Sequence, residues 1–266
     1  MKIVISGSSS GIGQAVTRSL LAKGHLVWGL ARSDQSSFVR EFPSSFRASK
    51  CDVSEFKALD RISQQITSEW DRIDSIITCA GIQGEIGKTL SSDPLNWEKT
   101  IKVNLLGTYN CLRALDLPLA KAERRAKIIC FSGGGATQAR ANFSAYGSAK
   151  TGIVRLVETI AAEEKNRALD INAIAPGAIN TRLTDEVISL GEAISGKIEY
   201  EAALKQKKEG GQSLTQALDL IEWLLSDKSD GISGKLISAQ WDDFKSLKAN
   251  QGTLGNPNSF TLRRIT

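Results

Sequence analysis

The sequence predicts a single doubly wound α/β domain: a mostly parallel sheet of seven strands with helices on both faces. Apolar runs of strand length alternate with segments of helical period, which is the pattern of successive βαβ units. The chain has 266 residues, 41% of them hydrophobic, which is enough for one domain with a substantial core.

The strands are expected where short apolar runs are bounded by turn residues. The first helix should follow the first strand directly, because Ile12, Val16 and Leu20 form an apolar stripe of helical spacing and Gly24 suits a helix end. The expected strands are residues 2–6, 25–30, 75–79, 127–131, 170–175 and 235–238, with a short seventh strand near 45–48.

Two segments differ from the regular alternation. Residues 183–213 are polar and rich in Gly, Lys and Glu, and we interpret them as a mobile helical flap beyond the Pro176-Gly177 break. Residues 250–266 have no periodicity and should form an extended C-terminal tail, an arm of the kind that often packs on a neighbouring subunit. The domain itself is expected to span residues 1–249.

Composition argues against several classes of partner. The net charge is only +5 and the basic residues are dispersed, so nucleic acid is not an expected partner. No run of about 18 apolar residues and no secretory signal are present, which predicts a cytoplasmic protein with no membrane partner. The four cysteines lack C-x-x-C spacing and are expected to be buried thiols, and no metal site is expected.

A glycine-rich turn follows the first expected strand. Glycines there permit positive φ and close approach of a pyrophosphate, and a helix N-terminus supplies unpaired N–H donors. The plainer alternative is a tight turn without a ligand. We expect a Rossmann-type nucleotide site, and its candidate residues are Gly7, Ser9, Ser10, Gly11, Ile12 and Gly13.

A tyrosine and a lysine stand four residues apart after the expected fifth strand. Tyr146 and Lys150 lie on one face of a helix that continues through Ile153, so both side chains can enter one cleft. Such a pair is common and by itself usually carries no chemistry. Its position in a dinucleotide fold makes it the candidate catalytic pair.

The glycine spacing Gly-x-x-x-Gly-x-Gly and the Tyr-x-x-x-Lys pair resemble the short-chain dehydrogenase/reductase family. The resemblance covers residues 1–181 and includes Cys51-Asp52-Val53, Cys79-Ala80-Gly81, Val103-Asn104 and Pro176-Gly177-Ala178-Ile179-Asn180-Thr181. It implies that Asp52 accepts a bond from adenine and that Thr181 and the backbone at Ile179 hold the nicotinamide carboxamide. Cys79 replaces the family's asparagine, which removes a bracing side-chain amide. The cofactor residues that the resemblance adds are Asp52, Val53, Ala80, Gly81, Tyr146, Lys150, Pro176, Gly177, Ile179 and Thr181.

The resemblance also assigns catalytic roles. Tyr146 is the expected general acid and base, because a cationic Lys150 and the positive nicotinamide ring should lower the pKa of its phenol toward the working range. Asn104 would hold a relay water through its main chain, or would be an exposed polar residue of its helix. The family's substrate-positioning serine falls at position 133, which is Gly133 here. Ser132 is the expected replacement, with Thr137 or backbone N–H groups as alternatives.

The end of the second strand predicts the dinucleotide. NAD binding generally needs an acidic residue there, and the position is Ala31. Arg32 and Ser33 follow and can hold a 2′-phosphate, which favours NADP. Asp34 leaves NAD open, and the plainer interpretation of Arg32 is a solvated loop charge.

The function predicted from these patterns is an NAD(P)-dependent oxidoreductase acting on a small alcohol or carbonyl substrate, and the resemblance implies a homodimer or homotetramer. One alternative is a dinucleotide-binding regulatory protein without turnover, which Gly133 and Cys79 motivate. Another is an enzyme modifying nucleotide-linked sugars, although that class usually has a different glycine spacing. Arg140 and the flap lysines would suit an anionic substrate, but solvated surface charge explains them equally well.

Overall fold

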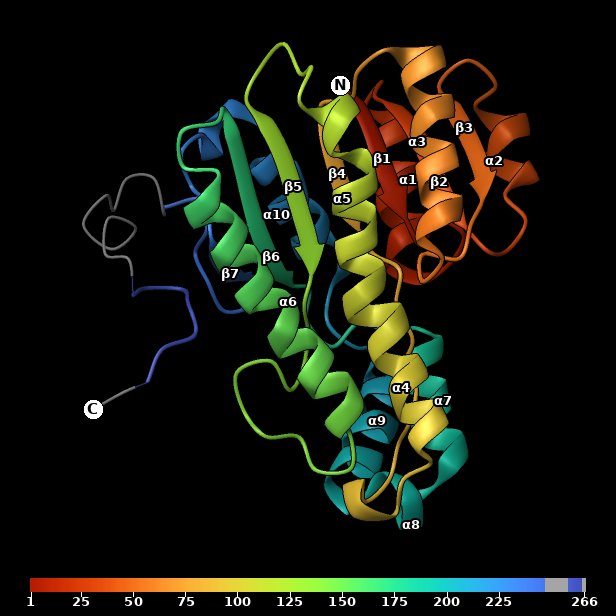
Figure 1. Cartoon of the computed structure of the whole chain (residues 1–266). Helices are drawn as coiled ribbons and strands as arrows, with labels where there is room; N and C mark the ends of the chain where they lie inside the picture. The colour runs from red at the N-terminus through yellow and green to blue at the C-terminus, as the bar shows by residue number, and fades with distance from the viewer. Residues whose placement is uncertain (247–257, 265–266) are drawn as a thin grey trace.

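Seven parallel strands form the central sheet in the computed structural model, which describes residues 1–246 and 258–264 (Figure 1). The strand order is β3-β2-β1-β4-β5-β6-β7, and every neighbouring pair is parallel. The predicted doubly wound class and strand number are therefore confirmed. The strands are β1 (Lys2–Ser6), β2 (Leu26–Ala31), β3 (Phe46–Lys50), β4 (Ser75–Thr78), β5 (Ala126–Phe131), β6 (Leu169–Ala175) and β7 (Lys235–Ser238).

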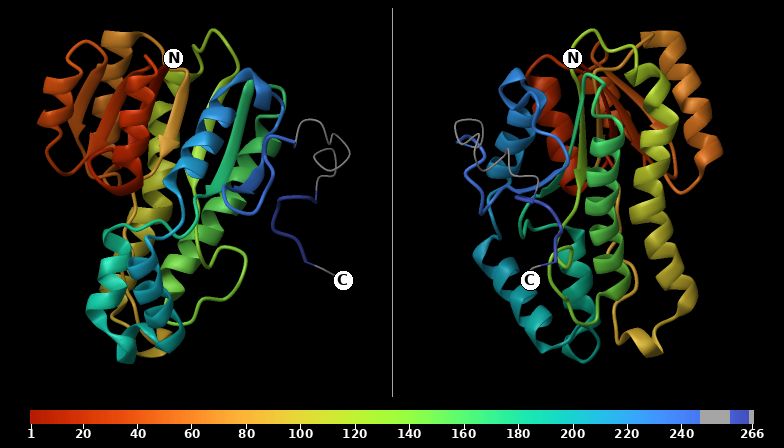
Figure 2. Two further views of the ribbon diagram at one scale, coloured as in Figure 1. Left: turned by 180° about the vertical axis from the view of Figure 1, so that it is seen from behind. Right: turned by 60° about the vertical axis from the view of Figure 1, so that its left-hand side comes forward.

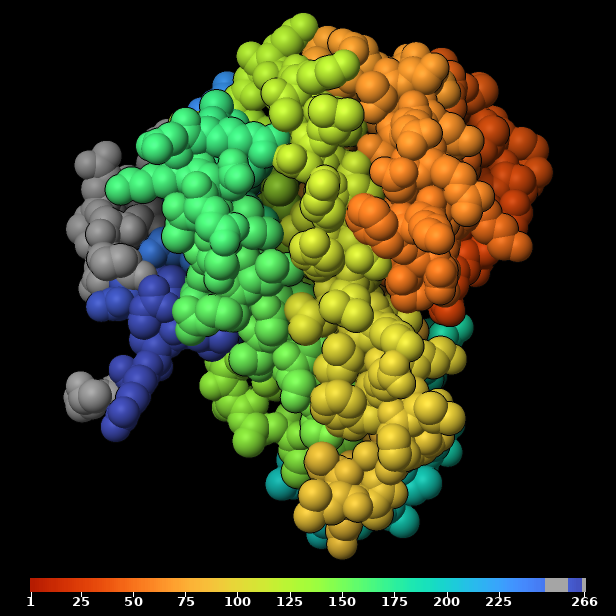
Figure 3. Space-filling view, viewed as in Figure 1, coloured from red at the N-terminus to blue at the C-terminus, as the bar shows by residue number. Residues whose placement is uncertain are grey.

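Helices cover both faces of this sheet. Figure 3 shows the outer surfaces of α3, α5 and α6 side by side across one face, and Figure 2 shows α1 and α10 on the other. The helices that cover the sheet are α1 (Gly11–Ala22), α3 (Phe56–Trp70), α5 (Gly107–Leu119), α6 (Ser144–Glu163) and α10 (Leu214–Leu225). The short helix α2 (Ser36–Glu41) lies beside the edge strand β3, and α4 (Pro94–Ile101) packs against α6 beyond the end of the sheet (Figure 1). Short 3-10 turns lie at η1 (Thr89–Ser91) and η3 (Asp227–Ser229), and a π-helical segment, η2 (Lys102–Leu106), joins α4 to α5.

The apolar strands are buried on both faces because successive side chains point to opposite sides. Val4 packs in the core beneath α3, α5 and α6, whereas Ile3 and Ile5 pack against α1 and α10. The central strands β4 and β5 show this two-sided burial, since all residues of both strands are buried. Two cores, one on each face, thus hold the sheet in place.

The strand order reverses between β1 and β4. In open α/β sheets a ligand binds at such a switch point, outside the carboxyl ends of the strands. The loops after β1 and β4 meet there closely: a Cβ atom added to Gly7 would lie 2.6 Å from the backbone nitrogen of Ala80. The sheet therefore places the glycine turn and the Cys79-Ala80-Gly81 segment at one rim.

Three helices form a separate layer beyond this rim: α7 (Arg182–Leu190), α8 (Glu192–Ser195) and α9 (Lys197–Glu209) (Figure 1). They occupy most of the predicted flap at 183–213, and its helical character agrees with the expectation. Gln212, after α9, accepts a hydrogen bond from the backbone nitrogen of Ala178 and donates its own N–H to the Ala178 carbonyl. The mobility of the flap stays a prediction.

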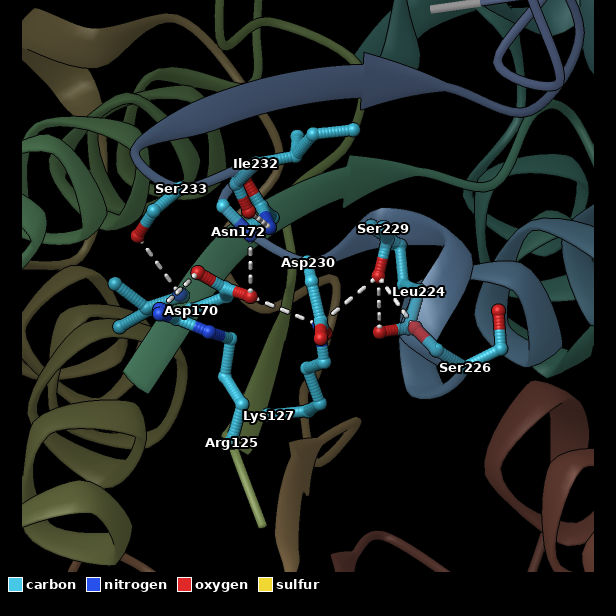
Figure 4. Close-up of polar contacts among 12 residues, drawn as sticks. Arg125, Lys127, Asp170, Asn172, Leu224, Ser226, Ser229, Asp230, Ile232 and Ser233 are labelled. Carbon is cyan, nitrogen blue, oxygen red and sulfur yellow. Dashed lines mark hydrogen bonds and ion pairs between the residues drawn. The ribbon is translucent and has the colours of Figure 1, made fainter. Parts of the chain in front are cut away.

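A buried ion cluster joins the amino ends of β5 and β6, at the edge opposite the switch point (Figure 4). Lys127 pairs directly with Asp170 across the two strands, with 2.8 Å between Nζ and Oδ2, and both side chains are almost fully buried. Lys127 also donates to Asp230 and Ser229, and Arg125 reaches the second oxygen of Asp170. A buried charge is tolerated only when it is paired and hydrogen-bonded, as here.

The described part of the C-terminal segment, residues 258–264, lies against β7 and α6 of the same chain. The N–H of Leu236 donates to the Phe260 carbonyl at 2.7 Å, and Lys235 donates to the Ser259 carbonyl. Glu158 of α6 accepts a hydrogen bond from the Leu262 nitrogen. Residues 250–257, 265 and 266 of the predicted tail lie outside the described residues, and its contact with a neighbouring subunit stays a prediction.

Over residues 1–246 and 258–264, no helix combines the length and apolar character that a membrane crossing requires. In the same described ranges, His, Cys, Asp and Glu side chains do not gather into a group of three or more suited to a metal ion. The four cysteines are free thiols, three of them buried and Cys79 partly buried.

Candidate active site

A cavity of about 330 Å³ opens at the switch point, where the carboxyl ends of the strands face α7. It brings together the glycine turn, the end of β2 and the Tyr146-Lys150 pair. Of the predicted site residues, Asn104, Gly177 and Ile179 do not line it. The predicted residues that do are Gly7, Ser9, Ser10, Gly11, Ile12, Gly13, Arg32, Ser33, Asp52, Val53, Ala80, Gly81, Ser132, Tyr146, Lys150, Pro176 and Thr181.

The glycine turn has the geometry of an anion-binding loop. Gly7 and Gly11 adopt positive φ angles of 75° and 54°, which side chains rarely tolerate. A Cβ at Gly13 would lie 2.2 Å from the Gly7 carbonyl oxygen, so the turn closes tightly on itself. Ser10 precedes α1 without a side-chain cap, leaving the first-turn N–H groups of a 12-residue helix to face the cavity. The turn thus fits a pyrophosphate.

A cation and a carboxylate stand at the far end of the cavity, beyond β2 and β3. Nη1 of Arg32 lies 3.9 Å from Oδ2 of Asp52, and the Arg32 side chain is more than half exposed. Partial burial opposes ionisation of Asp52, yet hydrogen bonds from Ser54 and the charge of Arg32 give its carboxyl a pKa below the usual value. Ser54 occupies one oxygen, Oδ1. The Arg32 guanidinium keeps donors free for a second anion.

The Tyr146-Lys150 pair lies on the first turns of α6, and both side chains are buried. The Lys150 ammonium lies 5.4 Å from the centre of the Tyr146 ring and donates to the Phe131 carbonyl at the end of β5 at 2.9 Å. The i, i+4 spacing therefore does place both groups in one cavity. The phenol also contacts a small apolar cluster with Ile86, Phe143, Val187 and Ala203, contributed partly by α7 and α9.

Among the chain's own groups, burial has the largest effect on the pKa of Tyr146, and the lowering expected with a bound nicotinamide ring stays a prediction. Burial raises the pKa of Tyr146 above its ordinary value, Arg140 lowers it in part, and Cys79 raises it further. Burial also lowers the pKa of Lys150 to about 8, although Cys79 and Cys130 oppose this. Arg140 is the cation that opposes the effect of burial on the Tyr146 pKa, and the Lys150 ammonium donates to a backbone carbonyl.

Position 133 and Ser132 have different roles in the structure. A Cβ atom at Gly133 would lie 3.0 Å from the Tyr146 hydroxyl, so a side chain at 133 would meet the phenol, and this chain has none there. Ser132 is buried, lines the cavity and donates its hydroxyl to the Lys150 carbonyl at 3.1 Å. Its hydroxyl therefore braces α6, and its role toward substrate stays a prediction.

Asn104 is fully buried in the π-helical segment η2. Its side-chain amide exchanges two hydrogen bonds with the backbone of Ile82, at 3.0 and 2.9 Å, and its carbonyl accepts from Thr108. The exposed helix position considered from the sequence is therefore wrong. Single π-helical turns frequently mark functional sites, and here the turn fixes the loop after β4 that lines the cavity.

The loop after β6 closes the cavity toward the flap. Thr181 caps α7 by accepting the N–H of Leu183, and a Cβ at Gly11 would lie 3.7 Å from the Thr181 methyl. The glycine turn and this loop therefore face each other across the cavity. Gly177 has φ of 99° and packs against Gln212, so it shapes the loop from outside.

Several cavity residues were not singled out as cofactor ligands from the sequence. Most of them directly precede or follow a predicted residue along the chain, so strand ends were the available signal. Arg182 and Leu183 follow Thr181, and their side of the cavity depends on how α7 docks. These residues are Leu30, Ala31, Cys51, Cys79, Ile82, Val103, Phe131, Arg182 and Leu183.

The fold and the cavity define a dinucleotide-binding α/β domain with a buried Tyr-Lys pair. A family model described as short chain dehydrogenase matches residues 1–189, and the chain belongs to this family. The chain is therefore an oxidoreductase of the short-chain dehydrogenase/reductase type.

Named relatives agree with this membership, and solved structures share the fold. The chain is 30% identical over 198 residues to "Short-chain reductase protein NovJ" of Streptomyces niveus, covering 73% of each chain. It is 28% identical to "3beta-hydroxysteroid dehydrogenase 1" of Eggerthella lenta, covering 87% of this chain and 89% of that one. A short chain dehydrogenases/reductase structure from Saccharomyces cerevisiae has a TM-score of 0.81 at 21% identity, covering 91% and 96%. A Shigella flexneri short chain dehydrogenase complexed with NADP has a TM-score of 0.75 at 23% identity, covering 90% and 96%.

Proposed function

We propose that this chain uses NADP(H) to interconvert a small alcohol and its carbonyl compound, with Tyr146 as the proton donor and acceptor. The observation that carries the proposal is that Tyr146 and Lys150 line the same cavity as the glycine turn. A nicotinamide cofactor, when bound, supplies or accepts the hydride. The glycine turn and the α1 N-terminus would hold its pyrophosphate, and Asp52 would hold its adenine end.

The proton would move at the Tyr146 hydroxyl. In the reducing direction the phenol would give its proton to the carbonyl oxygen, and in the oxidising direction the phenolate would take it back. Lys150 would orient cofactor and phenol from its position against the Phe131 carbonyl. The apolar side chains around Tyr146 would exclude water from the reacting atoms.

The preference for NADP over NAD rests on the end of β2. Ala31 supplies no carboxylate for ribose hydroxyls, and Arg32 and Ser33 line the cavity at that end. A guanidinium can bind a 2′-phosphate through paired charge-assisted hydrogen bonds. Replacing Arg32 by alanine should weaken NADPH binding at least tenfold while leaving NADH binding within about twofold. If Arg32→Ala bound NADPH as tightly as the wild type, measured by quenching of protein fluorescence, the preference for NADP would be refuted.

The reaction itself is tested by a carbonyl panel with NADPH, following loss of absorbance by the reduced cofactor. With an accepted substrate, Tyr146→Phe should lose about 10²–10⁴-fold in kcat while still binding NADPH. The matched control is Tyr109→Phe, on the exposed side of α5, which should keep its activity. Full activity of Tyr146→Phe would refute the proposed proton transfer.

A second candidate is a dinucleotide-binding regulatory protein without turnover. Gly133 favours it, because no side chain meets the Tyr146 hydroxyl at that position. This candidate predicts tight NADPH binding with no oxidation of the cofactor by any carbonyl compound of the panel.

Assembly and location are part of the proposal. We expect a homodimer or homotetramer in the cytoplasm, with no nucleic acid or membrane partner. Light scattering on the purified chain tests the first expectation, and cell fractionation tests the second.

A further inference from the structure

An ion pair connects the loop beside Tyr146 to the flap. Arg140 lies in the loop between β5 and α6, and its Nη2 donates to Oε2 of Glu199 on α9 at 2.7 Å. The two side chains are only 21% and 27% exposed, so the pair is better shielded from water than an ordinary surface pair. Figure 1 shows this loop and α9 at the end of the sheet where β5 finishes.

The Arg140 guanidinium is fixed on the active-site side by aromatic rings. Its central carbon lies 3.8 Å from the centre of the Phe143 ring, which is fully buried, and 5.9 Å from the centre of the Tyr146 ring. Stacking on Phe143 restricts the guanidinium to one position. Arginine keeps its charge at every working pH, whereas burial brings the pKa of Lys150 to about 8.

The triple glycine itself adds no side chain beside Arg140 or the phenol. A Cβ at Gly133 would lie 3.0 Å from the Tyr146 hydroxyl, and a Cβ at Gly134 would lie 3.9 Å from Nη1 of Arg140. Gly133 therefore lies beside the phenol, and the next residue, Gly134, lies beside the guanidinium. A side chain at either position would separate the cation from the proton-transfer site or compete with it.

We propose that Arg140 is a positioning residue for proton transfer at Tyr146, replacing with its charge the interaction that no side chain at position 133 supplies, and that Glu199 of α9 both holds and moderates it. The inference rests on the proposed role of Tyr146. Glu199 lies on α9, so the position of the flap would determine how strongly Glu199 offsets the charge of Arg140 near the phenol.

The charged and titratable groups that face Tyr146 come from four segments. Lys150 lies on α6, Cys79 follows β4, Arg140 lies in the loop before α6, and Glu199 acts from α9 through Arg140. Removing the Arg140 charge should therefore raise the pKa of Tyr146, and removing the Glu199 charge should lower it. These opposite directions separate an electrostatic role from a purely structural one.

The test is an NMR titration of the full chain carrying tyrosine labelled with ¹³C at Cζ. The chain has three tyrosines, so Tyr146→Phe assigns the resonance and Tyr109 and Tyr200 serve as internal references. Arg140→Gln should raise the proton affinity of the Tyr146 phenolate about tenfold. Glu199→Gln, which keeps an oxygen for Arg140, should lower it about threefold.

Two further variants keep the test decisive. Arg140→Lys keeps the charge and should lie between the wild type and Arg140→Gln, even if the glutamine variant folds poorly. Lys197→Gln changes an exposed charge of α9 and should leave the Tyr146 titration in place. An unchanged titration in Arg140→Gln, or a shift in the same direction for Arg140→Gln and Glu199→Gln, would overturn the inference.

This outcome is separable from the proposed function. If Tyr146→Phe abolishes turnover while Arg140→Gln leaves the phenol titration unchanged, the inference fails and the function stands. If Tyr146→Phe is fully active, the function fails, and the titrations still show whether Arg140 acts on the phenol.

Discussion

Replacing Lys150 by methionine should stabilise the folded chain although it removes a proposed catalytic group. Burial lowers the pKa of Lys150 from 10.5 to about 8, and that difference corresponds to about 3 kcal/mol of penalty for holding the cation inside the protein. Methionine removes this penalty but also the bond to the Phe131 carbonyl, which contributes about 1 kcal/mol. We expect Lys150→Met to gain about 2 kcal/mol in free energy of unfolding at neutral pH.

The pH dependence of this gain identifies its cause. The folded chain binds the Lys150 proton more weakly than the unfolded chain, so the penalty is complete below about pH 8 and disappears as the pH rises toward 10.5. Urea unfolding of wild type and Lys150→Met, followed by tryptophan fluorescence, should show stability curves that converge over this range and then cross, because only the lost hydrogen bond, about 1 kcal/mol, remains at high pH. Lys121→Met, which breaks an exposed pair with Asp71, is the control without such convergence. A constant difference in free energy of unfolding between wild type and Lys150→Met across this pH range would show that burial does not destabilise the Lys150 ammonium.

Two further changes test the frame around the site. Lys127→Met should cost about 3 kcal/mol in urea unfolding, because it leaves Asp170 buried without its main partner; the double variant Lys127→Met/Asp170→Leu should recover part of that loss, and no recovery would contradict the account. Gly7→Ala should lose NADPH binding and more stability than Gly24→Ala, since both have positive φ but only Gly7 has backbone within contact of a Cβ. Equal losses in thermal unfolding of the two alanine variants would show that close packing at Gly7 is unimportant.

Local patterns were sufficient to predict the sheet and the glycine turn. Most strands contain short apolar runs bounded by turn residues, although the edge strand β3 (Phe46–Lys50) is largely polar. The first helix begins within the Gly7–Gly13 turn, so neighbouring residues carry the information. The same holds for Tyr146 and Lys150, whose spacing is fixed by the helix that contains them.

Contacts between distant segments could not be predicted in this way. Arg140 and Glu199 are 59 positions apart, and their pairing depends on how α9 docks beyond the sheet. The direction of the Tyr146 pKa depends on burial by α7 and α9 as well as on nearby charges. The Ser132 hydroxyl has several partners compatible with its sequence position, and the choice of the Lys150 carbonyl is a matter of packing.

The contact of Phe260 with Leu236 has a consequence for solubility. Strand β7 lies last in the sheet order, and an uncovered outer strand can pair with a strand of another molecule and start aggregation. The Phe260 carbonyl takes the Leu236 N–H that such a strand would need, and Lys235 is held by the Ser259 carbonyl. The segment at 258–264 thus covers the edge of the sheet and blocks the addition of a strand from another molecule.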